Sequence, residues 1–168
     1  FGSVSLYSQR QVQAGELLRY GNHIGVVEEI GLRTTQIRTL DNTIVSVPNS
    51  RLAYEDLENV SRRERIIYKP RLRLRLDTNT QQLRAIVADI EAMLRSHEKV
   101  WDEVQRVHFR DFGTYALEVA VHAYILTTRF DEYLDITQRF NLEMLEIVHR
   151  HGAALAQALT EGRLDAAR

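Results

Sequence analysis

The chain changes its hydrophobic period at one point, and this change limits the folds that it can adopt. Over residues 71–76 arginine alternates with leucine, which is the two-residue period of a strand with one charged and one apolar face. The residues that follow have helical spacing as far as about His97, and Asp77 or Thr78 is the predicted N-cap. The apolar positions of this helix are Leu83, Ile86, Val87, Ile90 and Leu94. A strand followed by an amphipathic helix predicts a sheet covered by helices.

Two more strands and a second helix complete this layer. We expect strands over residues 104–110 and 115–127, with the turn between them at 112–114. A helix over about 130–151 follows, and Gly152 ends it. Its apolar stripe contains Tyr133, Ile136, Phe140, Met144, Ile147 and Val148. The β-α-β-β-α order predicts a ferredoxin-like domain, in which both helices cover one face of an antiparallel sheet.

The first part of the chain has a different character, with short β-branched segments between residues 17 and 61. Asp41-Asn42 is a hairpin turn signal, and Pro48 cannot donate to a ladder, so we expect a strand to end at Pro48. Asn49 or Ser50 is predicted to cap the turn that follows. The glycines with predicted turn roles are Gly15, Gly21, Gly25 and Gly31. This pattern predicts a small half-open β-barrel.

Composition excludes several classes of protein. With 168 residues and 44% hydrophobic content, the chain is long enough for one domain or two small ones. The net charge of −1 provides no global field toward nucleic acid or an anionic membrane, and the absence of cysteine excludes disulfides and thiolate sites. The longest apolar stretch, residues 116–126, is shorter than the roughly 20 residues of a spanning helix. The chain starts without an initiator Met or a signal-like segment, so we expect a piece of a longer protein.

Arg71, Arg73 and Arg75 form the most concentrated basic feature and are the candidate site residues. Two interpretations stay open at this point: a solvated sheet face, or an electropositive wall that biases the ions near it. A nucleic-acid surface is disfavoured, because binding sheets of this type carry stacking aromatic residues and the residues between these arginines are leucines.

No metal, cofactor or catalytic site is predicted. His149 and His151 are two residues apart on a predicted helix, so their side chains point away from each other. Carboxylate pairs such as Glu28 and Glu29 are adjacent in a strand or turn, where neighbouring side chains diverge. The sequence contains no phosphate-binding Gly-Lys loop and no nucleophile elbow. We therefore do not expect an enzyme.

Residues 13–35 resemble the start of the cytoplasmic β-domain of small-conductance mechanosensitive channels, the MscS family. They contain Gly15-Glu16, a second Gly before a tight turn and the stretch Val-Glu-Glu-Ile-Gly-Leu-Arg-Thr-Thr. Residues 38–50 are similar to the family's hairpin, which ends in Pro-Asn, and residues 59–62 resemble the Asn-x-Ser-Arg that closes the β-domain. The β-α-β-β-α segment matches the family's C-terminal α/β domain in order and length.

The resemblance implies an α+β chain with two domains. A Sm-like or SH3-like β-barrel is expected over residues 13–62, and the ferredoxin-like domain over residues 63–152. Residues 1–12 are expected to be a residual membrane-proximal segment. Residues 153–168 are expected to be a C-terminal tail that frays. The aromatic-Pro segment that leads to the family's final strand has no counterpart at residues 153–157, so we expect assembly through that strand to be lost.

The resemblance also implies a function. The chain would be the cytoplasmic vestibule and ion filter of a homo-oligomeric, usually heptameric, channel in the inner cell membrane, anchored by segments absent from this chain. Ions and small osmolytes would pass through it when membrane tension opens the pore. Arg71, Arg73 and Arg75 would face the vestibule or a neighbouring subunit. The alternative function is a soluble Sm-like plus ferredoxin-like scaffold or RNA- or protein-binding module.

Overall fold

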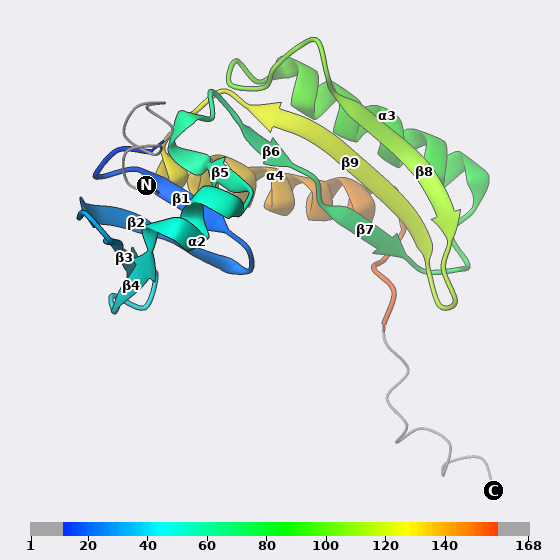
Figure 1. Cartoon of the computed structure of the whole chain (residues 1–168). Helices are drawn as coiled ribbons and strands as arrows, with labels where there is room; N and C mark the ends of the chain where they lie inside the picture. The colour runs from blue at the N-terminus through cyan, green and yellow to red at the C-terminus, as the bar shows by residue number, and fades with distance from the viewer. Residues whose placement is uncertain (1–11, 158–168) are drawn as a thin grey trace, which may run out of the picture. The chain divides into compact units, whose positions relative to one another are not determined.

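The computed structural model describes residues 12–157 (Figure 1). Contacts divide the chain into two compact units, Phe1–Arg63 and Glu64–Arg168, which we call the β unit and the α/β unit. The predicted membrane-proximal segment lies outside the described residues except for Val12, and so does the predicted tail beyond Gln157.

The β unit is one antiparallel sheet with the strand order β4-β3-β2-β1-β5. Its strands are β1 Leu17–Tyr20, β2 His23–Ile30, β3 Thr34–Thr39, β4 Ile44–Pro48 and β5 Leu57–Asn59. The short helix α2 (Asn49–Tyr54) connects β4 to β5, and the 3-10 turn η1 (Val60–Arg62) follows β5. Pro48 is the last residue of β4, as its missing N–H predicts.

The predicted barrel is not closed in the described part of the chain, because β4 and β5 remain the two edges of the sheet. Leu52 of α2 packs with Tyr20, Ile37 and Val47 in a buried cluster. The helix therefore covers apolar surface that a closed barrel would cover by pairing its edge strands.

One predicted turn residue has another role in the sheet. Gly25 lies inside β2, where a Cβ would come within 2.5 Å of Ile37 Cγ2, so close strand contact excludes a side chain there. Asp41 and Asn42 lie in the turn between β3 and β4, where the hairpin is predicted, and Asn42 has the positive φ (63°) of a turn residue. Gly15 (φ 90°) and Gly21 (φ 52°) have the left-handed backbone of turn glycines.

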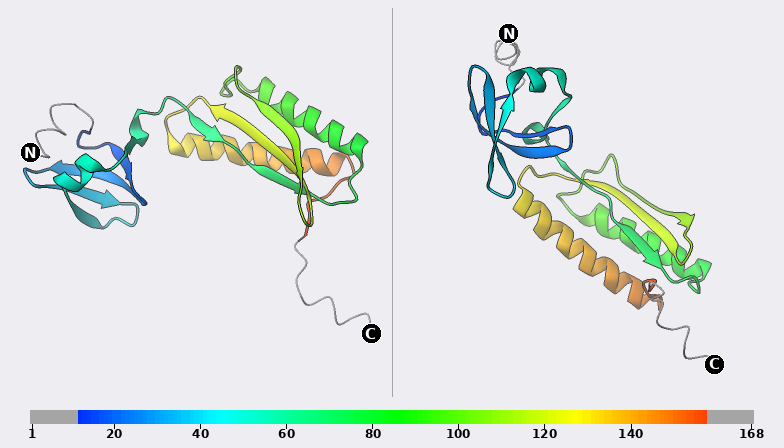
Figure 2. Two further views of the ribbon diagram at one scale, coloured as in Figure 1. Left: turned by 45° about the vertical axis from the view of Figure 1, so that its right-hand side comes forward. Right: turned by 60° about the horizontal axis from the view of Figure 1, so that its bottom comes forward.

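The α/β unit has the predicted β-α-β-β-α order, with one additional short strand at its start. Its elements are β6 Ile66–Tyr68, β7 Arg71–Leu74, α3 Thr80–Ser96, β8 Arg106–Phe112, β9 Leu117–Ile125 and α4 Phe130–Arg150. The central strand β9 pairs with β8 on one side and with β6 and β7 on the other, always antiparallel. Both helices cover the same face of the sheet (Figure 2). The mixed α+β class is confirmed.

The core of this unit follows the predicted periods. Alternate residues of β9, from Leu117 to Ile125, are buried against the helices. The buried residues of the helices are Leu83, Ile86, Ile90, Met93, Leu94, Ile136, Phe140, Met144, Ile147 and Val148. The predicted N-cap of α3 is wrong by one or two residues: Asn79 accepts from Gln82 N–H, and the Gln82 side chain accepts from Asn79 N–H. Thr78 instead donates to Arg75 O.

The segment after α4 extends the sheet instead of fraying over its described residues. Gly152, with φ 69°, ends the helix as predicted and turns the chain. Arg75 N–H then donates to Ala154 O at 3.0 Å, and Ala156 N–H donates to Arg73 O at 2.7 Å. The segment has no β-branched residue, so its sequence carried no strand signal.

Candidate functional site

The open face of the α/β sheet is the face away from the helices, and it carries the candidate arginines. In β7, Arg71 and Arg73 are exposed, whereas Leu74 is fully buried. Arg71 lies opposite Ala120 of β9, and Arg73 lies opposite Glu118. The two-residue period of the strand puts both guanidinium groups on the open face.

Glu118 links the two arginines. Arg71 Nη1 lies 3.4 Å from Glu118 Oε2, and Arg73 Nε lies 3.4 Å from Glu118 Oε1. The Glu118 side chain is only 17% exposed, while the two arginines are more than half exposed. One carboxylate therefore neutralises part of the charge, and the cluster keeps a net charge of +1.

Arg75 does not belong to this cluster. β7 ends at Leu74, and Arg75 forms a two-point ion pair with Asp77, at 2.7 and 3.2 Å. Leu76 is 58% exposed and does not continue the buried row. A backbone turn begins here, because Thr78 N–H donates to Arg75 O, and this turn breaks the alternation. The predicted row of three arginines thus has two members.

Aromatic side chains also occupy the open face, which the sequence argument against nucleic acid did not anticipate. His122 and Tyr124 of β9 are in edge contact, and Tyr124 is in edge contact with Trp101. Arg65 lies 3.7 Å above the Trp101 ring. The alternation of residues 117–125 could have located His122 and Tyr124 on this face. These rings pack on one another and are half-buried, so they are not free stacking platforms.

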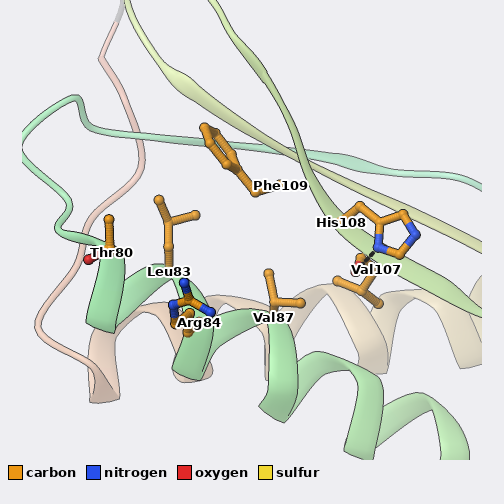
Figure 3. Close-up of a pocket in the computed structure, with 7 residues that line it drawn as sticks. All are labelled: Thr80, Leu83, Arg84, Val87, Val107, His108 and Phe109. Atoms are coloured by element: carbon orange, nitrogen blue, oxygen red, sulfur yellow. Dashed lines mark hydrogen bonds between the residues drawn. The ribbon is translucent and has the colours of Figure 1, made fainter.

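Two hollows lie on the α/β unit. One, of about 360 Å³, is lined by Arg73 and Glu118 together with the β8–β9 turn and residues 156–157. The other, of about 380 Å³, lies between α3 and β8 (Figure 3). In the close-up, Leu83 and Val87 of α3 face Phe109 and Val107 of β8. The second hollow is apolar and contains no acidic residue among those that line it.

The β unit has one carboxylate with a displaced pKa. Burial raises the pKa of Glu16, but hydrogen bonds from Gln13 N–H, Arg62 and Asn59 outweigh burial, so the pKa lies below its ordinary value. The donor–acceptor distances are 2.8 Å from Gln13 N, 3.0 Å from Arg62 Nε and 2.8 Å from Asn59 Nδ2. Glu16 therefore joins the start of β1 to the end of the unit.

Asn49 does not cap α2, contrary to the prediction. It is the first residue of the helix, Pro48 holds the N-cap position, and no side chain caps the helix. Asn49 is 2% exposed, its Oδ1 accepts from Thr35 Oγ1, and its Nδ2 donates to Gly31 O at 2.8 Å. Its role is to connect the β2–β3 turn and β3 to the start of α2.

Within residues 12–157, no group of three or more His, Asp or Glu side chains could hold a metal ion. Over the same residues, no helix combines the length and the apolar content needed to cross a bilayer.

Comparison with known families gives two matches in chain order. The profile described as "Mechanosensitive ion channel, beta-domain" matches residues 1–62. The profile described as "Mechanosensitive ion channel MscS, C-terminal" matches residues 72–155, which is half of the chain.

Relatives of known sequence agree with these matches. An uncharacterized MscS family protein of Aquifex aeolicus is 33% identical over 148 residues, which are 88% of this chain and 40% of that protein. The low conductance mechanosensitive channel YnaI of Escherichia coli is 32% identical over 160 residues, covering 93% of this chain and 46% of YnaI. The chain spans less than half of the length of either relative.

Solved structures share the fold. The cryo-EM structure of Arabidopsis thaliana MSL1 superposes with a TM-score of 0.87 at 24% identity, over 94% of this chain and 57% of that one. The closed state of Helicobacter pylori MscS superposes with a TM-score of 0.78 at 13% identity, over 95% of this chain and 62% of that one.

Proposed function

Because the chain belongs to the MscS family of mechanosensitive ion channels, we propose that it forms the vestibule of such a channel, outside the membrane and on its cytoplasmic side. The full-length protein would be a homo-oligomeric ring that opens under membrane tension. The resemblance to the MscS family implies a heptamer. It would release ions and small osmolytes from the cell. The membrane would be the inner cell membrane, and segments outside this chain would span it.

One observation carries the proposal: profiles for a β-domain and for a C-terminal domain of mechanosensitive channels match the two units in order. The relatives include proteins named as channels, such as the large-conductance mechanosensitive channel MscMJLR of Methanocaldococcus jannaschii, 29% identical over 154 residues. The sequence-derived domain limits, 13–62 and 63–152, are kept as part of the proposal. The matched family is a channel family and not an enzyme class, so we propose no catalytic activity.

Arg71 and Arg73 would act as a weak filter in this vestibule. They are exposed on the open sheet face and keep a net positive charge beside Glu118. Fixed positive charge in a confined aqueous chamber raises the local anion concentration within about 8 Å at physiological ionic strength. Arg75 is neutralised by Asp77 and is left out of the filter.

The test uses the natural full-length protein that contains this chain. It is expressed in a bacterial strain that lacks its own mechanosensitive channels, and membrane patches are recorded while suction is applied. We expect pressure-activated currents, and survival of the cells after a sudden fall in external osmolarity. The empty vector is the control. Normal insertion into the membrane with no current at any tolerated pressure would contradict the proposal.

A further inference from the structure

The groove between α3 and β8 has the features of a binding surface. Leu83, Val87 and Phe109 line it (Figure 3). The neighbouring Phe112 is 76% exposed and in edge contact with Phe109 at 4.9 Å between ring centroids. β8 is an edge strand, since β9 is its one partner among the described residues. Apolar side chains thus line an uncovered edge of the unit.

Of the described residues that line this groove, the one with a fixed charge, Arg84, is positive. Arg84 is exposed and forms no ion pair within the described part of the chain. The other titratable lining residue is His108. A complementary partner should therefore present apolar side chains together with carboxylates.

The first turns of α4 present this combination. Phe130 and Leu134 are one helical turn apart and are 55% and 47% exposed. Asp131 and Asp135 follow each of them directly, are exposed, and form no ion pair with any residue from 12 to 157. We call these four residues the α4 ridge.

The groove and the α4 ridge lie at opposite edges of the α/β unit. α3 packs beside β8. α4 lies beneath β6 on the other side of β9: Tyr133 Oη donates to Ile67 O at 3.1 Å, and Tyr68 Oη donates to Asn141 Oδ1 at 2.7 Å. The ribbon views show the same order across the sheet (Figures 1 and 2). One unit therefore cannot bring its own ridge to its own groove.

We propose that the groove binds the α4 ridge of a second copy of this chain, with Arg84 of one subunit against Asp131 and Asp135 of the next. Such a contact joins two different surfaces, so it runs head to tail and closes into a ring when the rotation allows. The proposal rests on the homo-oligomeric ring of the proposed function, and it assigns a specific contact between neighbouring α/β units in that ring.

Disulfide cross-linking tests this contact in the full-length protein after any cysteines outside this chain are replaced by serine, because the chain itself contributes none. Arg84→Cys combined with Asp135→Cys should give, on mild oxidation, a ladder of cross-linked species from dimer up to the complete ring. Each single variant should stay monomeric on a denaturing gel. The matched control pair is Ala92→Cys with Glu143→Cys, two exposed positions outside both surfaces, which should give no ladder.

A charge exchange provides the second measurement. Arg84→Asp and Asp135→Arg, each alone, should lower the yield of a chemical cross-link between subunits several-fold, and the double variant should restore it. Absence of a ladder, dimers from a single cysteine variant, or no rescue in the double variant would overturn the proposed contact. Pressure-activated currents are recorded for every variant. If the double-cysteine variant conducts but gives no cross-linked ladder, the proposed interface alone is refuted. If the parent protein gives no pressure-activated current, the proposed function is refuted.

Discussion

Thr35 donates a hydrogen bond of 2.7 Å to Asn49, and both residues are almost completely buried in the β unit, at 1% and 2% exposure. Asn49 also donates to Gly31 O, and its own N–H donates to Arg33 O at 2.8 Å. One asparagine side chain thus holds the β2–β3 turn, β3 and the start of α2 together. A buried amide with all these partners stabilises the fold mainly because its loss leaves the partners unsatisfied.

Asn49→Ala should destabilise the β unit by on the order of 2 to 3 kcal/mol, because it leaves the Thr35 hydroxyl and the Gly31 carbonyl without partners. Ser50→Ala, at the exposed next position, is the control and should change stability by less than about 0.5 kcal/mol. The measurement is amide hydrogen exchange of β2 and β3. Equal exchange in both variants would show that the buried connection contributes nothing.

Asn79→Ala should lower the stability of the α/β unit by about 1 kcal/mol, the usual cost of a lost N-cap. Asp77→Ala should have a much smaller effect, because Asp77 forms a surface ion pair with Arg75 and does not cap α3. Urea unfolding followed by the fluorescence of Trp101, the one tryptophan of the chain, reports on this unit. A larger loss of stability in Asp77→Ala than in Asn79→Ala would contradict Asn79 as the N-cap and favour the predicted position at Asp77.

These two corrections show where sequence reasoning reaches its limit. The alternation of Arg71 to Leu74 and the helical stripes identified the sheet and its helices, because burial of one face acts on every second or every third to fourth residue. A cap or a buried asparagine depends on one hydrogen bond, and Asp77, Thr78 and Asn79 are all chemically suited to cap. The pairing of residues 154–156 with β7 is a tertiary contact that local sequence does not encode.

Glu16 should make the β unit sensitive to acid. Its pKa is below 4.5 in the folded state because of three hydrogen bonds, so its contribution is complete above about pH 4.5 and is lost as the pH falls through the folded-state value. Glu16→Gln should reduce stability at pH 7 and flatten the dependence below pH 4.5. Exchange of the Val27 amide, which donates to Glu16 O, measures this effect. Glu58→Gln, in an exposed pair with Arg19, is the control and should keep the parent's pH dependence.

In the proposed channel, the Glu118 carboxylate offsets part of the positive charge of Arg71 and Arg73. Removing the arginines and removing the carboxylate should therefore shift the reversal potential in opposite directions. Arg71→Gln with Arg73→Gln should shift the reversal potential in a salt gradient toward cation preference. Glu118→Gln should shift it toward anions, because both guanidinium groups lose their shared partner. Arg75→Gln should have little effect, since Asp77 already neutralises Arg75. The shifts should be larger at low salt, where the charges are screened less and their field reaches further, and the tension needed for opening should change little. Identical reversal potentials in all variants at low salt would leave these arginines as a solvated face or a subunit contact.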